Sequence, residues 1–160
     1  MLFKNVLVPY DESEHAAAAL HLAIDLVGDD PEATIRVVTV VSNDIMPPSA
    51  FSAAVAFDTS PVSYENYEAL LSHIAERSDR ELHDDVAGLL GKDMQGIHAK
   101  LVIETRLAGS PVEGITNYAM DHRCDLIVMG RRGLGALRGM LGSVSYGVLR
   151  SADIPVLTVK

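Results

Sequence analysis

Residues 126–152 read LIVMGRRGLGALRGMLGSVSYGVLRSA, an apolar run followed by a glycine-rich segment and a helical pattern. The apolar run is typical of a strand that is buried on both faces of a parallel sheet. Gly142 and Ser143 open a short helix that we expect to end near Arg150. A strand, a glycine-rich loop and a helix start in this order indicate an α/β fold with a loop at the carboxyl end of a strand.

The glycine-rich segment also favours an anion. Residues 126–152 contain no acidic residue, which leaves nine basic against 22 acidic residues elsewhere in the chain. Glycines let backbone N–H groups approach a ligand, and a helix start attracts phosphate. A solvated loop is the alternative, but the position between a buried strand and a helix favours phosphate binding. The residues concerned are Gly130, Gly133, Gly135, Gly139, Gly142, Arg131, Arg132, Arg138 and Arg150.

The same alternation of strand and helix extends over the rest of the chain. Apolar runs predict strands at residues 6–9, 35–41, 99–106, 125–129 and 154–159. Amphipathic or capped segments predict helices over residues 14–27, 63–90, 110–122 and 143–150. Residues 43–62 are aperiodic and predict a loop. Asp11 or Ser13 is expected to cap the first helix, and Ser110 with Pro111 to begin the third.

Strict alternation predicts a parallel sheet with helices on both faces. We therefore expect one α/β domain over residues 1–160, with an open five-stranded parallel sheet in the order 3-2-1-4-5. Ligands of such sheets bind outside the carboxyl ends of the strands, where the strand order reverses. The candidates for a site are therefore the residues just after each strand, which are Tyr10-Asp11, Val41-Ser42, Arg106 and Gly130 onward.

Composition excludes several classes of protein. The net charge of −9 disfavours nucleic acid and anionic membrane surfaces as partners. The low aromatic content of 5%, without Trp, argues against a platform on which bases of a single strand stack. The single cysteine, Cys124, excludes a disulfide framework. The N-terminus has no signal-peptide pattern, and no apolar stretch approaches the roughly 18 residues of a membrane span. These features predict a cytoplasmic protein.

Familiar catalytic and phosphate-binding motifs do not occur. The sequence lacks the phosphate-binding motifs GxxxxGK[ST] and GxGxxG, and it lacks the GxSxG elbow of hydrolases with a serine nucleophile. The six histidines have no spacing that predicts a metal site. A phospho-acceptor receiver domain would need an aspartate after the third strand, but that strand ends with Glu104-Thr105-Arg106.

The sequence resembles the universal stress protein family over essentially its whole length. The matching segments are VLVPYDESEHAAAAL near the N-terminus and DLIVMGRRG, LGSVSYGVLR and IPVLTVK in the last third. Members that bind ATP carry the pattern G-x2-G-x9-G-[ST]. Here Gly130 and Gly133 match its start and Gly142-Ser143 its end, with eight residues, 134–141, in place of nine.

The resemblance implies an ATP site and assigns residues to it. Asp11 would contact adenine or ribose, and Val40 would meet adenine through its backbone. Met129 and Gly130 would flank the ribose and phosphates, and the phosphates would lie along Arg132 and Gly133. The helix start would bind them through Gly142, Ser143 and Val144. Pro9 and Tyr10 complete the expected set, and Mg²⁺ would accompany ATP because of its phosphate charge.

The implied function is a nucleotide-dependent regulator in a stress response. No general base is evident near the phosphates, so we expect at most slow ATP hydrolysis and no efficient enzyme. The last strand, Ile154 to Val159, is expected at a sheet edge, where an apolar strand invites pairing with a second copy. The resemblance implies the same homodimer.

Two alternatives remain open at this stage. The first is an interaction module of the same fold in which the shorter segment no longer admits ATP. The second is a true nucleotide hydrolase. Nucleotide retained on purification would distinguish the first alternative, and turnover well above background would support the second.

Overall fold

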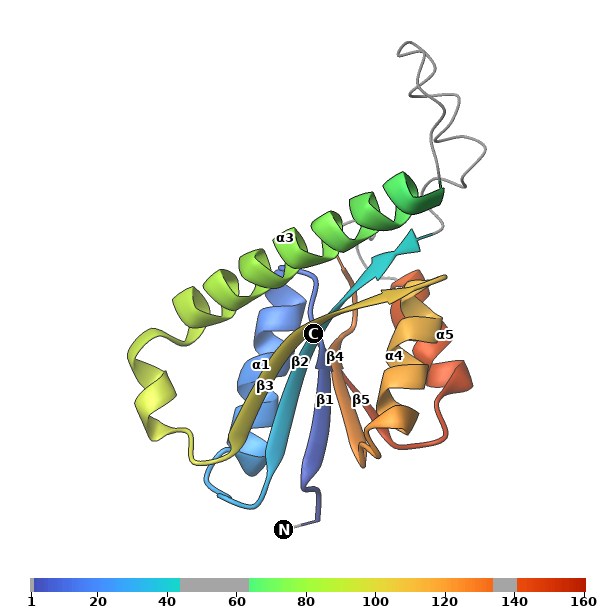
Figure 1. The fold of residues 1–160 in the computed structure, drawn as a ribbon. Helices are drawn as coiled ribbons and strands as arrows, with labels where there is room; N and C mark the ends of the chain where they lie inside the picture. The colour runs from blue at the N-terminus through green and yellow to red at the C-terminus, as the bar shows by residue number, and fades with distance from the viewer. Residues whose placement is uncertain (1, 44–63, 134–140) are drawn as a thin grey trace.

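Five strands form one parallel sheet between two layers of helices (Figure 1). The computed structural model describes residues 2–43, 64–133 and 141–160. The loop expected over residues 43–62 therefore lies almost entirely outside the described residues.

The sheet has the order β3-β2-β1-β4-β5, and all its neighbouring strands are parallel. The predicted strand order 3-2-1-4-5 is confirmed. The strands are β1 (Asn5–Pro9), β2 (Thr34–Ser42), β3 (Lys100–Ala108), β4 (Leu126–Gly130) and β5 (Val156–Val159). β5 begins two residues later than expected, and Pro155, which precedes it, has no N–H to donate to a ladder.

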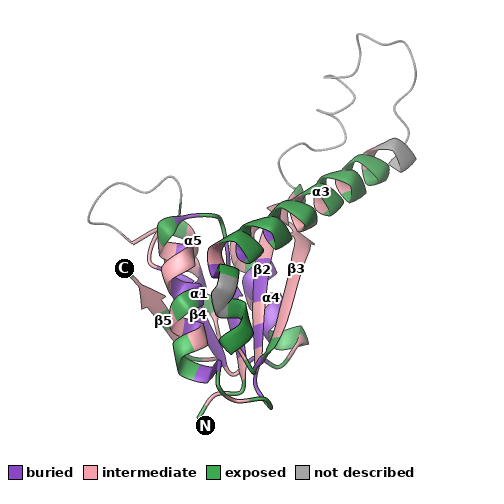
Figure 2. Cartoon of the chain, turned by 90° about the vertical axis from the view of Figure 1, so that its left-hand side faces the viewer, coloured by how far each residue is buried: buried purple, intermediate pink, exposed green. Residues whose placement is uncertain are grey.

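The helices cover both faces of the sheet. They are α1 (Glu14–Val27), α3 (Tyr64–Leu90), α4 (Pro111–Asp121) and α5 (Ser143–Ser151), and a 3₁₀ helix, η2 (Gly91–Gly96), follows α3. Alternate residues of β1 separate the two cores: Val6 and Val8 pack with α1 and α3, whereas Leu7 packs with α4 and α5. Figure 2 shows the buried strands between these layers and the exposed outer face of α3.

Two serines begin helices as the sequence predicts. The Oγ of Ser13 accepts a hydrogen bond from the backbone N of Ala16 at 3.2 Å, and the Oγ of Ser110 accepts one from the N of Glu113 at 3.2 Å. Each serine satisfies an N–H group that the helix itself leaves without a partner. Of the two candidate caps for α1, the structure selects Ser13.

The long helix α3 also protects one edge of the sheet. Its side chains Leu82 and Val86 are buried against the sheet, in the same core as Ile103 of β3. The Oδ1 atom of Asp79 on α3 accepts a hydrogen bond from the backbone N of Thr105 at 2.9 Å. Because β3 is an edge strand, this carboxylate occupies an N–H group that would otherwise be open to another strand.

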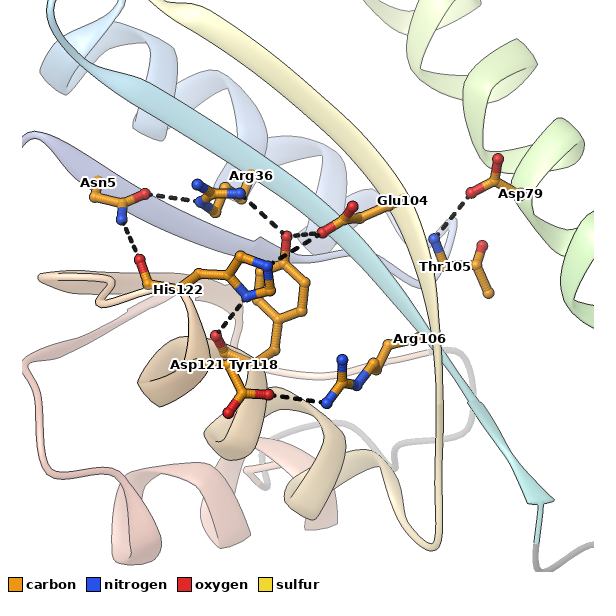
Figure 3. A network of polar contacts seen from close by, with 9 residues as sticks. All are labelled: Asn5, Arg36, Asp79, Glu104, Thr105, Arg106, Tyr118, Asp121 and His122. Atoms are coloured by element: carbon orange, nitrogen blue, oxygen red, sulfur yellow. Dashed lines mark hydrogen bonds and ion pairs between the residues drawn. The ribbon is translucent and has the colours of Figure 1, made fainter.

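A polar network ties α4 to three strands (Figure 3). The Nε of Arg36 donates to Asn5 at 2.9 Å, and its guanidinium donates to the Tyr118 hydroxyl at 3.4 Å. That hydroxyl donates to Glu104, and the ring of Tyr118 stacks on His122 with 4.0 Å between centroids. Burial, followed by the Glu104 hydrogen bond, raises the pKa of Tyr118 to about 12. The phenol therefore stays protonated and holds α4 in place at neutral pH.

The other end of α4 packs closely on the sheet at Gly114. A methyl group at this position would lie 2.5 Å from Cγ1 of Val40 and 3.0 Å from Cβ of Ala108. Helix α4 thus approaches the carboxyl ends of β2 and β3 as closely as a glycine allows. A methyl group added at Gly88 of α3, in contrast, would have no atom within 4 Å.

The two helical glycines should therefore respond oppositely to alanine. We expect Gly114→Ala to lower the free energy of unfolding by about 1–3 kcal/mol, because the added methyl forces α4 away from Val40. Gly88→Ala should raise it by up to about 1 kcal/mol, because alanine favours a helix and nothing obstructs it. Urea denaturation measures both. Equal effects at the two positions would contradict the close packing of α4.

Candidate functional site

The centre of the sheet opens toward its carboxyl end. The pairing of β1 with β4 covers only Val6 with Leu126 and Leu7 with Ile127. On its other side β1 pairs with β2 as far as Pro9. The two central strands therefore separate before they end, and the chain continues from them on opposite faces of the sheet. This is the place where open α/β sheets bind ligands.

A cavity of about 590 Å³ lies at this point, and we call it the β1–β4 cavity. The residues that the family resemblance assigns to the site all border it: Pro9, Tyr10, Asp11, Val40, Met129, Gly130, Arg132, Gly133, Gly142, Ser143 and Val144. The other candidates from the strand ends and the basic segment do not border it: Val41, Ser42, Arg106, Arg131 and Arg150. The structure thus brings the assigned set together from four separate segments of the chain. Gly135, Arg138 and Gly139 lie outside the described residues. That the set binds a nucleotide stays a prediction.

Asp11 follows β1 and turns back onto the chain. Its Oδ1 atom accepts hydrogen bonds from the Oγ of Ser13 at 2.5 Å and from the backbone N of Ser13 at 3.2 Å. Glu12 between them has φ 62°, a left-handed conformation that makes this tight turn possible. A Cβ at position 133 would lie 2.3 Å from Oδ2 of Asp11, so Gly133 leaves the room that the carboxylate occupies.

The backbone of β2 continues past the end of β1. The N–H of Tyr10 donates to the carbonyl of Val38 at 2.9 Å, which is the last contact of this ladder. Alternate residues of a parallel strand direct their backbone groups to the same side. The N–H and C=O of Val40 therefore face the side where β1 has already ended, and they offer one donor and one acceptor to the cavity.

The first turn of α5 forms another wall. Its N-cap, Gly142, has no side-chain hydrogen bond, in contrast to the serine caps of α1 and α4. The N–H of Gly142 donates to the carbonyl of Arg131 at 3.0 Å. The next N–H groups, of Ser143 and Val144, have no partner among the described residues. They form the positive end of the helix dipole at the cavity and suit an anion.

Gly142 does not need glycine for its backbone conformation. Its φ of −65° and ψ of 151° are accessible to any residue. A side chain at this position therefore meets no obstacle from the backbone conformation. What remains is a steric reason, because a Cβ would lie 3.3 Å from Cα of Arg132 at the mouth of the helix start.

Charge and polarity are unevenly distributed in the cavity. Among the described lining residues, Asp11 is the one carboxylate and Arg132 the one cation. The Nε of Arg132 is buried without a hydrogen-bond partner in the described part of the chain. A buried guanidinium nitrogen without a partner is costly, and a phosphate oxygen would satisfy it. The cavity also has an apolar wall, which includes Val38, Ile115 and Met129.

Sequence reasoning missed several lining residues, which are Ala16, Val38, Thr39, Pro111, Ile115, Leu141 and Ser145. Pro111 and Ile115 come from α4, and only the close packing at Gly114 brings that helix to the cavity. Ser145 lies two residues beyond the predicted helix start, in the first turn of α5. Its Oγ donates to the carbonyl of Gly130 at 2.8 Å and joins α5 to β4.

Other classes of site have little support. Within the described ranges, no three His, Cys, Asp or Glu residues gather closely enough to hold a metal ion. Cys124 is buried, and burial raises the pKa of its thiol to about 11, so it is a poor nucleophile. No described helix combines the length and the hydropathy that crossing a membrane requires.

Comparison with known proteins adds a family. The model of the universal stress protein family matches residues 2–160. A universal stress protein of Thermus aquaticus is 29% identical over 99% of this chain and 100% of its own length. The universal stress protein MJ0577 of Methanocaldococcus jannaschii is 27% identical over 100% of this chain and 96% of its own length.

Solved structures share the fold. The structure of MJ0577 has a TM-score of 0.72 at 24% identity and covers 100% of this chain and 97% of its own. A universal stress protein of Archaeoglobus fulgidus in complex with dAMP has a TM-score of 0.59 at 19% identity, with full coverage of both chains. A universal stress protein in complex with cAMP has a TM-score of 0.57 at 21% identity, covering 99% and 98%.

Two neighbouring serines of α5 should differ in their effect on the free protein. Ser145 is 3% exposed and bonds the Gly130 carbonyl, so Ser145→Ala should lower the free energy of unfolding by about 1–3 kcal/mol. Ser143 is exposed and has no hydrogen bond in the described structure, so Ser143→Ala should change it by less than about 0.5 kcal/mol. Thermal or urea denaturation without nucleotide measures both. A larger loss for Ser143→Ala would contradict this arrangement of the helix start.

Proposed function

The chain belongs to the universal stress protein family, and we propose that it binds ATP in the β1–β4 cavity. The observation that carries the proposal is the uncapped start of α5 beside the unpartnered Nε of Arg132. Together they offer backbone N–H groups and a guanidinium to one anionic group. The complexes of two structural neighbours with dAMP and cAMP support an adenine nucleotide as the ligand class.

The polarity of the cavity gives the ligand a direction. The phosphates lie along Arg132 and Gly133 and at the α5 start, where Gly142, Ser143 and Val144 contact them. The adenine lies on the apolar wall with its edge toward Val40. The ribose lies between these ends, against the strand ends and close to Asp11. The strand-end contacts come from Pro9, Tyr10, Met129 and Gly130.

The free backbone groups of Val40 favour adenine over guanine. The C=O of Val40 can accept a hydrogen bond from the exocyclic amino group of adenine, and its N–H can donate to an adjacent ring nitrogen. Guanine carries an oxygen acceptor in place of that amino group. Two acceptors would then face each other, which leaves a carbonyl without its partner and costs affinity.

The proposed role is binding and regulation in a cytoplasmic stress response, with at most slow ATP hydrolysis. Asp11 is the one lining carboxylate among the described residues, and Ser13 already engages it. No lining histidine or second carboxylate in that part of the chain is available as a general base. Mg²⁺ would be held chiefly by the phosphate oxygens of ATP and by water.

One observation favours a second candidate, an interaction module that binds no nucleotide. The segment between Gly133 and Gly142 has eight residues, one fewer than in the ATP-binding pattern. Mass spectrometry of the small molecules released from freshly purified, denatured protein separates the two. Released adenine nucleotide supports the ATP proposal, whereas a protein that neither retains nor takes up nucleotide is the interaction module.

Isothermal titration should show ATP binding that is tighter than GTP binding and that depends on the start of α5. Gly142→Val places a branched side chain where the phosphate approaches the N–H groups. We expect it to weaken ATP binding by more than about 2 kcal/mol, roughly thirtyfold. Ser143→Ala should weaken binding by a smaller factor while leaving stability unchanged.

Gly96→Val is the matched control for this titration, because no atom lies within 4 Å of a Cβ at Gly96. It should bind ATP as the unchanged protein does. Equal affinities for ATP and GTP would contradict the role of Val40. If Gly142→Val binds ATP normally, the phosphate site is assigned to the wrong helix start.

We also propose a homodimer through β5. This strand is the second edge of the sheet, and its outer backbone groups have no partner among the described residues. Leu157 on this strand is 39% exposed, and Tyr146 and Leu149 of the neighbouring helix α5 are 58% and 42% exposed. An apolar edge strand of this kind favours pairing with a second copy.

The dimer predicts an oligomeric state that light scattering measures. The unchanged protein should have twice the mass of one chain, and Leu157→Lys should give monomers because it places a charge on the paired edge. Ile74→Lys is the control, since Ile74 is 39% exposed on α3, which packs against β3 at the opposite edge of the sheet. A monodisperse monomer for the unchanged protein would refute the dimer.

A further inference from the structure

We infer that Ser13 is a positioning residue for the nucleotide site: its hydroxyl orients the Asp11 carboxylate toward a ribose hydroxyl and so sets selectivity for the intact ribose. The inference rests on the proposed function and deepens it. Ser13 does not line the cavity, and its hydrogen bond with Ala16 alone would identify it only as the cap of α1.

The hydroxyl of Ser13 has a single possible arrangement of its proton. Ser13 is 8% exposed, and its Oγ accepts a hydrogen bond from the N–H of Ala16 at 3.2 Å. Its other neighbour is Oδ1 of Asp11 at 2.5 Å, and an ionised carboxylate can only accept. The Ser13 proton must therefore point at Asp11. One hydroxyl thus caps α1 and holds the carboxylate at the same time.

Both donors of Ser13 engage the same oxygen of Asp11. Oδ1 accepts from Oγ and from the backbone N of Ser13, and Oδ2 has no hydrogen bond among the described residues. Oδ2 faces Gly133, where even a Cβ would approach to 2.3 Å. The free oxygen therefore lies at the border of the cavity, in space that the absence of a side chain at Gly133 leaves open.

The position of Oδ2 selects the part of the ligand that it meets. Oδ2 lies beside Gly133, next to the proposed phosphate contacts, and a carboxylate repels phosphate. Its partner is therefore a neutral donor in the part of the ligand that adjoins the phosphates. The group between the phosphates and the base is the sugar, and its hydroxyls are donors. A hydroxyl that donates to Oδ2 forms a charge-assisted hydrogen bond, which is stronger than a neutral one.

Ser13 matters because an oriented acceptor binds better than a mobile one. Without the Oγ, the carboxylate keeps only the 3.2 Å contact with the backbone N of residue 13 and can rotate about its side-chain bonds. Ordering the carboxylate on binding then costs conformational entropy, which the unchanged protein has already lost when it folds. Ligands that lack the contacted hydroxyl do not use the carboxylate and lose little.

The test measures the affinities of ATP, 2′-deoxy-ATP and 3′-deoxy-ATP by isothermal titration. In the unchanged protein, the analogue that lacks the contacted hydroxyl should bind about tenfold more weakly than ATP. In Ser13→Ala that ratio should fall to about twofold or less, and Ser13→Thr, which keeps the hydroxyl, should restore it. In an Asp11→Ala background, Ser13→Ala should change the ratio no further.

Ser110→Ala is the matched control. It removes an equivalent serine cap, from α4, and its Oγ contacts the N of Glu113 and no carboxylate at the cavity. It should leave the ratio unchanged whatever it does to stability. If Ser13→Ala weakens all three nucleotides by one common factor, or if the unchanged protein does not discriminate among them, the inference is wrong although nucleotide binding stands. If the unchanged protein binds none of them, the proposed function fails as well.

Discussion

The separation of β1 from β4 is the constraint on which the rest of this molecule depends. The ladder between these two neighbouring strands stops at Leu7 and Ile127, before either strand ends. The chain leaves β1 toward α1 on one face and β4 toward α5 on the other, so none of the described segments fills the space between them. The cavity is thus a property of the topology, and the side chains decide only what it accepts.

Three hydroxyl groups hold the edges of this opening. Thr39 donates to the carbonyl of Tyr10 at 2.8 Å, Ser145 donates to the carbonyl of Gly130, and Ser13 donates to Asp11. Each joins a segment that follows a strand to a neighbouring element. Loops at a binding site lose entropy when a ligand orders them, and these contacts remove part of that loss in advance. The polar network at Tyr118 serves the same end, because it anchors the helix that brings Ile115 to the cavity.

The alternation of strands and helices predicted the parallel sheet, and the family resemblance assigned most but not all of the residues that line the cavity. Apolar runs and serine caps mark the elements, and the glycines after β4 mark a close approach of backbone. The contribution of Pro111 and Ile115 was not predictable, since it depends on how closely α4 packs at Gly114. The unpartnered Nε of Arg132 and the paired role of Ser13 also depend on tertiary contacts that no spacing encodes. The backbone of Gly142 is ordinary, so glycine matters at this position for the space that it leaves.

The carboxylate of Asp79 has a consequence beyond the stability of β3. It accepts the hydrogen bond of the Thr105 N–H on the outer strand β3, and α3 packs against the same strand. The opposite outer strand, β5, has no comparable hydrogen bond on its outer side in the described structure. A sheet with two open edges can add molecules without limit and grow into a filament. A sheet with one guarded edge can join a second copy only once, since the complex then presents guarded edges at both ends. With the dimer proposed through β5, Asp79 would thereby favour a closed assembly of two-fold symmetry over an open polymer.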